Sequence, residues 1–180
     1  MIPKTAPELA PDGPTAIVLV ESYSGLGVHT LLSVMRLFPR HFKNMVFVST
    51  GLVDSAQFKG VDELGALEAK VRGDLEQYVA LAGRMGMYAE YRYTLGTDLV
   101  QELETISTDL VREFRRPVVF AGQLVFQREN LFTRTLHHET AFSIQRRLQF
   151  AGIQVIVLPI RVWEAPRVAP AGRAIRHARA

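Results

Sequence analysis

The stretch ESYSGLGVHT, residues 21–30, holds the residues best placed to do chemistry. It follows a short apolar run and precedes an apolar stretch with helical spacing, which is typical of a strand, a tight turn and a helix. Gly25, Gly27 and the first backbone amides of such a helix could form a nest for an anion such as phosphate. A tight turn with close packing of the helix on the strand needs the same glycines, and we prefer this simpler interpretation.

Neither common nucleotide-binding motif is complete around this turn. A dinucleotide fingerprint has a third glycine where this chain has Thr30. It also has an acidic residue at the end of the second strand, where Ser49 and Thr50 stand. A P-loop requires Gly-Lys-Ser/Thr, and the turn contains no lysine. The nest therefore stays a candidate without a motif behind it.

A serine nucleophile is the next candidate, because Ser24 occupies a strand–turn–helix like the elbow of a hydrolase. The elbow pattern G-x-S-x-G is broken by Ser22 and Leu26. His29 is too close in sequence to be the usual triad histidine, and no acid is clearly matched to the later pair at 137–138. We interpret Ser22 and Ser24 as turn and cap residues, and we expect no enzyme.

Metal and thiol chemistry have no support in the sequence. The chain has no cysteine, and its five histidines show neither H-x-x-x-H nor H-E-x-x-H spacing. We therefore expect no metal site.

The basic isoelectric point of about 9.4 does not indicate a nucleic-acid partner. Residues 164–180 carry four arginines against one glutamate, which accounts for the whole net charge of +3. This stretch of Pro, Ala and Arg predicts a disordered basic tail, with an anionic membrane surface as the alternative role. Residues 1–14 read as a linker, and no apolar run approaches the roughly 20 residues that span a bilayer. We expect a soluble, cytoplasmic chain.

The central part of the chain alternates between strand and helix patterns. Val28, Leu31, Leu32 and Met35 mark the buried face of the first predicted helix. The second predicted helix has apolar residues at 64, 67, 71, 75, 79 and 82. In the third, Thr97 or Asp98 can cap the first turn. Glycines at 86 and 152 end the second and fourth helices. Strands are predicted over 15–21, 44–50, 88–94, 117–122 and 153–160, and helices over 27–38, 62–85, 97–114 and 139–150.

Five strands alternating with four helices predict one α/β domain over residues 15–163. We expect a parallel, doubly wound sheet in the order 3-2-1-4-5, a Rossmann-like three-layer sandwich. Ligands of such sheets bind at the carboxyl ends of the strands, where the chain order reverses. The opening stretch and the segment AGQLVFQREN, after strand four, fall there. The candidate ligand-binding residues are Glu21, Ser22, Ser24, Gly25, Gly27, His29, Thr50, Gly122 and Gln123.

The segments YSGLGVHTLLSVMRLFPRHFKNMVFVSTGLVDSAQFKG, EYRYTLGTDLVQE and FAGQLVFQRENLFTRTLHHETAFSIQRRLQFAGIQVIVLPIRV carry a family likeness. Over residues 15–162 the chain resembles the soluble C-terminal domain of bacterial amino acid permease-like transporters of the APC superfamily, which has a universal-stress-protein-like fold. The resemblance implies a non-catalytic cytoplasmic domain that regulates or dimerises a transporter, with the membrane domain as its partner. The alternative is a stand-alone universal-stress-type protein that binds a nucleotide.

The same resemblance bears on cofactors. Many universal stress proteins bind ATP through G-x-x-G, a spacer and G-S/T after strand four. Here Gly122 is followed by QLVFQRENLFTRTLHHETAF, which lacks the second glycine and the G-S/T. We therefore expect no cofactor held by that motif, although ATP or another nucleotide stays open. Glu21 matches the acidic residue that the family often places after strand one, which implies a contact to a base or ribose.

The last strand, IQVIVLPIRVW, is predicted at an edge of the sheet. It is apolar on both faces, and Pro159 has no amide hydrogen to donate. An exposed apolar edge needs a cover. We expect a homodimer through this strand, with Val155, Val157 and Trp163 in the interface; the alternative is a monomer whose tail folds back over the strand.

Overall fold

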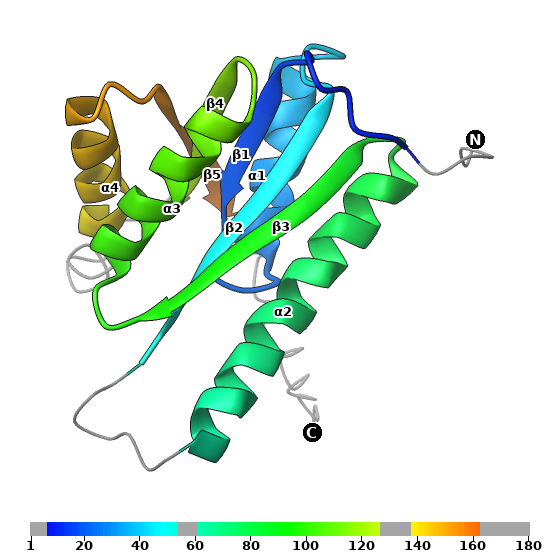
Figure 1. Ribbon diagram of the computed structural model, residues 1–180. Coiled ribbons are helices and arrows are strands. Elements are labelled where there is room, and N and C mark those ends of the chain that lie inside the picture. The colour runs from blue at the N-terminus through cyan, green and yellow to red at the C-terminus, as the bar shows by residue number, and fades with distance from the viewer. Residues whose placement is uncertain (1–6, 54–60, 127–137, 163–180) are drawn as a thin grey trace, which may run out of the picture.

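The computed structural model describes residues 7–53, 61–126 and 138–162 (Figure 1). Within these ranges strands and helices alternate along the chain as predicted. The elements are β1 (Thr15–Leu19), α1 (Gly25–Leu37), β2 (Asn44–Leu52), α2 (Val61–Arg84), β3 (Tyr88–Gly96), α3 (Leu99–Glu113), β4 (Pro117–Phe126), α4 (His138–Phe150) and β5 (Val155–Val162). His137, Trp163 and the basic tail lie outside the described residues.

The five strands form one parallel sheet in the order β3-β2-β1-β4-β5, which confirms the predicted topology. β1 lies in the middle and pairs with β2 on one side and β4 on the other. β5 is an edge strand, as expected, and β3 is the other edge.

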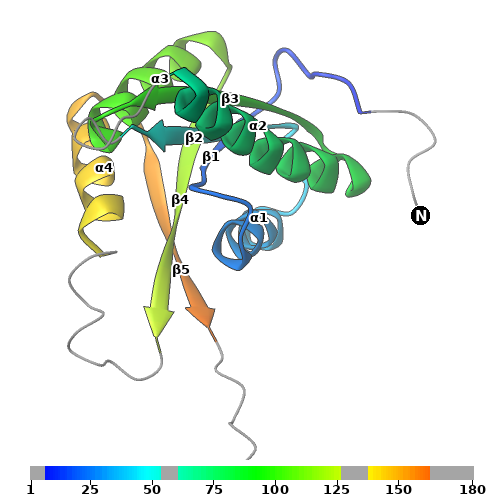
Figure 2. The ribbon, with the colours of Figure 1, turned by 90° about the horizontal axis from the view of Figure 1, so that it is seen from below.

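Helices cover both faces of the sheet, which gives a three-layer sandwich. Figure 2 shows α1 on one side of β4 and β5 and α4 on the other. Two separate cores result, one under α1 and α2 and one under α3 and α4. β1 supplies alternate residues to each: Ala16 and Val18 face the first core, and Ile17 and Leu19 face the second. Strands buried on both faces explain the continuous apolar runs in the sequence.

The buried face of α1 differs from the prediction. Leu32 is 39% exposed, whereas Val34 is completely buried. The small residues Gly27 and Thr30 also face inward. A pattern of large apolar residues misses small ones, which here set the face that approaches the sheet; for Leu32 the prediction was wrong.

β4 is longer than predicted, and this changes the place of one candidate residue. The strand continues to Phe126 because Gln123–Phe126 pair with Pro159–Val162 of β5. Gly122 lies in β4 as predicted, whereas Gln123 lies within the strand rather than in a segment after it, and for Gln123 the prediction was wrong.

The predicted cap of the third helix and the two predicted glycine stops are confirmed. Asp98 caps α3 by accepting hydrogen bonds from the amides of Val100 and Gln101, both at 3.0 Å. Gly86 and Gly152 follow α2 and α4 with φ of 79° and 77°, a left-handed conformation that favours glycine.

The described part of the predicted linker is held against the domain. The side chain of Asn44 accepts a hydrogen bond from the amide of Ala10 and donates one to the carbonyl of Ala10, both at 2.8 Å. Among the described residues, none of the helices has the length and apolar character that crossing a membrane requires.

Candidate functional site

The β1–α1 turn lies at the carboxyl end of the central strand. β1 is followed by α1 on one face of the sheet, and its neighbour β4 is followed in sequence by α4 on the other face. This is the switch point at which ligands bind in open α/β sheets. The residues around it divide into two groups with different contacts.

Ser24 is the cap of α1, as the sequence analysis interpreted it. Its backbone is extended, with φ −144° and ψ 163°, and its side-chain oxygen accepts a hydrogen bond from the amide of Gly27 at 3.4 Å. The amide of Val28 donates to the Ser24 carbonyl at 3.0 Å, which starts the helix. The hydroxyl of Ser24 therefore satisfies one of the first amides of the helix.

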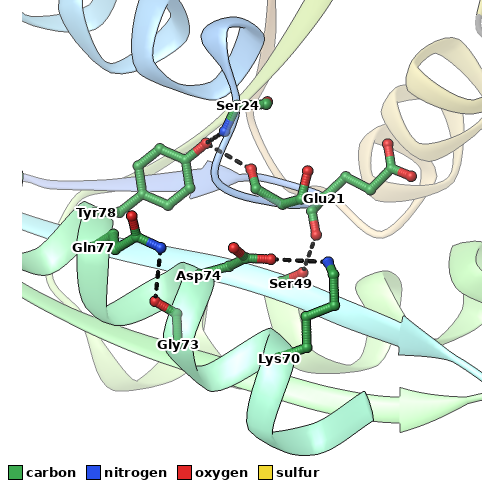
Figure 3. Close-up of polar contacts among 9 residues, drawn as sticks. Glu21, Ser24, Ser49, Lys70, Gly73, Asp74, Gln77 and Tyr78 are labelled. Atoms are coloured by element: carbon green, nitrogen blue, oxygen red, sulfur yellow. Dashed lines mark hydrogen bonds and ion pairs between the residues drawn. The ribbon is translucent and has the colours of Figure 1, made fainter. Parts of the chain in front are cut away.

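Tyr78, from the middle of α2, closes the turn from the side (Figure 3). Its hydroxyl donates a hydrogen bond to the carbonyl of Ser22 at 2.8 Å and accepts one from the amide of Ser24 at 3.2 Å. Its ring is fully buried, stacks on Phe47 at 5.0 Å between ring centroids, and lies 4.9 Å from the ring of Tyr23. The side chain of Tyr78 thus connects the turn to α2.

The sequence analysis missed Tyr78 because it followed only the apolar residues of this helix. The signal was present, since Val71, Leu75, Tyr78 and Ala82 follow one another at intervals of three or four residues, and all four are buried. A buried tyrosine needs a partner for its hydroxyl, so its place in this row implies a polar group nearby.

Two of the candidate glycines serve close packing. A β-carbon at Gly27 would overlap the hydroxyl of Tyr78 and would lie 2.7 Å from its Cζ. A β-carbon at Gly122 would overlap the hydroxyl of Thr30 and would lie 3.1 Å from a methyl group of Leu26. At Gly25, in contrast, a β-carbon would meet nothing within 4 Å.

Burial also affects the acidity of Tyr78. Removal of the phenol from water raises the pKa of Tyr78 above its ordinary value of 10.0, and the hydrogen bond from the Ser24 backbone opposes this. The hydrogen bond donated to the Ser22 carbonyl requires the neutral hydroxyl, which is therefore the form present near neutral pH.

The second group is a row of polar residues across the sheet at its carboxyl edge. Thr50 pairs with Thr94, and their hydroxyl oxygens are 3.1 Å apart. Leu19, the last residue of β1, pairs with both Val48 and Ala121. Thr50 and Gln123 lie two residues further along their strands, and Glu21 follows two residues after the end of β1. We call Thr94, Thr50, Glu21 and Gln123 the carboxyl-edge row.

Two hydrogen bonds keep the backbone around Glu21 beside β2. The amide of Val20 donates to the carbonyl of Val48 at 2.9 Å, and the hydroxyl of Ser49 donates to the carbonyl of Glu21 at 3.1 Å, so the chain stays beside β2 after β1 ends. Within β1, Ile17 and Leu19 face the core under α3 and α4. Figure 3 shows its carboxylate pointing away from Tyr78.

Seven of the nine predicted site residues fall into two groups, and two belong to neither. Glu21, Thr50 and Gln123 share the carboxyl-edge row. Ser22, Ser24, Gly25 and Gly27 form the turn under Tyr78. The remaining two lie apart: Gly122 faces α1, and His29 is exposed on that helix.

The carboxyl-edge row offers a carboxylate, an amide and two hydroxyls. Glu21 is exposed, Gln123 and Thr94 are half-buried, and Thr50 is 8% exposed. Such a row can accept hydrogen bonds from hydroxyl or amino groups of a ligand. Among the described residues, no three metal-ligating side chains come together.

Comparison with known proteins gives the fold. No protein-family model matches the chain. No curated protein matches it either. Among solved structures, a member of the universal stress protein family from Burkholderia pseudomallei matches with a TM-score of 0.56 and 15% identity, over 84% of this chain and 100% of that one. A universal stress protein from Archaeoglobus fulgidus matches with a TM-score of 0.55 and 12% identity, over 80% and 92% of the two chains.

A third solved structure, the universal stress protein UspA from Lactobacillus plantarum, matches with a TM-score of 0.51 and 15% identity, over 81% of this chain and 97% of that one. The chain therefore has a universal-stress-protein-like fold, as the resemblance implied. These matches do not concern a membrane transporter.

Proposed function

We propose that this chain is a non-catalytic, universal-stress-type protein that binds a nucleoside or nucleotide at the carboxyl-edge row. The observation that carries the proposal is the position of Glu21, two residues beyond the paired end of β1 and tied to β2 by the hydroxyl of Ser49, at the carboxyl edge where Thr50 and Gln123 also lie. A carboxylate there can accept hydrogen bonds from both hydroxyls of a ribose, and the neighbouring hydroxyl and amide can bind either a sugar or a base.

Two further observations support this proposal. The matched stress proteins are covered over 92% to 100% of their own length, so the likeness extends over nearly the whole of each of those chains. The hydroxyl of Ser24, the earlier candidate for a nucleophile, accepts the hydrogen bond that caps α1. This supports binding without catalysis.

Calorimetric titration with adenosine, AMP, ATP and cyclic dinucleotides tests the proposal. Glu21→Gln should weaken binding about tenfold, because a hydrogen bond to a charged group contributes about 1.5–3 kcal/mol. Glu8→Gln is a matched control, since Glu8 is exposed and precedes Ala10, which is tied to the first residue of β2 at the opposite edge. Absence of binding by every one of these ligands at millimolar concentration would refute the proposal.

Association with an amino acid permease-like transporter is the second candidate, and it rests on the segment resemblance alone. In that case the same domain would be a regulatory or dimerisation module of a larger assembly. The reading frame around the chain decides this point. If neither that frame nor a neighbouring one encodes membrane-spanning segments, the transporter role loses its support.

A further inference from the structure

The β1–α1 turn has the shape of an anion site, but two of its amides, those of Ser24 and Gly27, already have partners within the chain. A phosphate at the start of a helix needs backbone amides that are free to point at it. Here the amide of Ser24 donates to the hydroxyl of Tyr78, and the amide of Gly27 donates to the side chain of Ser24. A phosphate oxygen would have to displace the Tyr78 hydroxyl to reach the Ser24 amide.

That displacement is unfavourable because Tyr78 is fixed at both ends. Its hydroxyl also donates to the carbonyl of Ser22, which would lose its partner, and its ring is stacked on Phe47 inside the first core. An unpaired buried polar group costs about 1–3 kcal/mol. The ring cannot slide toward α1, since a single additional carbon at Gly27 would already overlap its hydroxyl.

The charges beside the turn also disfavour an anion. Asp74, one turn before Tyr78 on α2, lies close enough for its charge to act on the Tyr78 hydroxyl. The ammonium group of Lys70 is 3.1 Å from the carboxylate of Asp74, so this cation is engaged in an ion pair (Figure 3).

We infer that the ligand of the carboxyl-edge row is a nucleoside-like molecule recognised by its hydroxyl and amino groups, and that Tyr78 excludes phosphate from the β1–α1 turn. This inference rests on the proposed function and names the class of its ligand. Adenosine should bind as tightly as AMP and ATP, within about threefold. Tyr78→Phe, which frees the Ser24 amide, should make AMP and ATP bind more tightly than adenosine.

Calorimetry of the wild type with adenosine, AMP and ATP tests this inference separately from the proposed function. Equal affinities support both. ATP that binds more than tenfold more tightly than adenosine overturns the inference and leaves nucleotide binding standing. Failure of all three to bind overturns the proposed function.

Amide NMR of the wild type tests the turn without any substitution. Adenosine should shift the amide signals of Thr50 and Thr94. Inorganic phosphate at millimolar concentration should leave those of Ser24 and Gly27 unchanged. A phosphate-dependent shift of the Ser24 amide would show that Tyr78 yields to an anion, which contradicts the inference even if Tyr78→Phe does not fold.

Discussion

Gly27 and Tyr78 are in such close contact that a β-carbon at the first would overlap the hydroxyl oxygen of the second. The glycine belongs to the first turn of α1, and the tyrosine comes from the middle of α2. Each therefore restricts the other: the missing side chain makes room for the phenol, and the phenol holds the turn through Ser22 and Ser24.

Gly27→Ala should destabilise the protein by about 1–3 kcal/mol, although alanine is the better helix former, because the new methyl group has no room. Chemical denaturation measures this change. Gly73→Ala in α2 is the matched control, since a β-carbon there meets nothing within 4 Å, and it should stabilise by up to about 1 kcal/mol.

A double-mutant cycle identifies the cause. The cost of Gly27→Ala should fall in a Tyr78→Phe background, where the overlapping oxygen is gone, without vanishing, because Cζ stays 2.7 Å from the new methyl group. Equal costs in the two backgrounds would mean that the glycine is needed for another reason.

The contribution of Tyr78 to stability should depend on pH in the alkaline range. Burial raises the pKa of Tyr78 in the folded state above its ordinary value of 10.0. The folded state thus prefers the protonated form, so the stabilisation is complete below pH 10 and is lost as the pH rises through the folded-state pKa. Tyr78→Phe should cost about 1–3 kcal/mol at pH 7, and this difference from wild type should shrink above pH 10.

Comparing wild type and variant at each pH removes the other tyrosines from the measurement. The pKa values of Tyr88 and Tyr93 are also raised, because their hydroxyls donate to the carboxylates of Glu90 and Glu68. These groups titrate in both proteins. A difference that stays constant to pH 11 would contradict the role given to the Tyr78 hydroxyl.

The strands and their order were predictable from the sequence because a strand buried on both faces is a continuous apolar run, and alternation with helices leaves few topologies. Caps such as Asp98 were predictable because they act locally. The contacts of Tyr78 were not, since they join two elements far apart in the chain. The grouping of the carboxyl-edge row was not predictable either: the sequence named Glu21, Thr50 and Gln123, but only the strand register and the hydrogen bond from Ser49 to Glu21 place them at one edge.

Ser107 should be a residue whose removal stabilises the fold. It is fully buried in α3, and its hydroxyl has no hydrogen-bond partner in the described part of the chain. Burying a polar group without a partner is unfavourable, so Ser107→Ala should raise the free energy of unfolding by about 1 kcal/mol or more. Thermal and urea denaturation measure this.

Ser143→Ala separates this effect from helix propensity. Ser143 is exposed in α4, so its substitution reports propensity alone, which is worth about 0.5 kcal/mol. The gain at Ser107 should be the larger of the two. A loss of stability in Ser107→Ala would mean that the hydroxyl has a favourable role that its contacts do not reveal.

The two edges of the sheet differ in how they are protected, which bears on the predicted homodimer. On β3, Arg92 lies 2.7 Å from Glu90 and 3.0 Å from Glu113, and such charges discourage pairing with another chain. On β5, residues 155–160 contain no charged side chain. β5 is therefore the edge that needs a cover.

We predict that two copies associate through β5. The exposure of each β5 side chain indicates whether it can contact a second copy. Val155 is only 8% exposed within its own core, whereas Val157 is half-buried, so Val157 is the better probe; Trp163 lies outside the described residues. Val157→Glu should weaken the dimer at least tenfold in analytical ultracentrifugation, because a charge in an interface loses its water. Leu52→Glu, at an exposed position on β2, should leave the dimer intact. A wild type that sediments as a monomer at high concentration would rule the dimer out, and circular dichroism must show that Val157→Glu still folds.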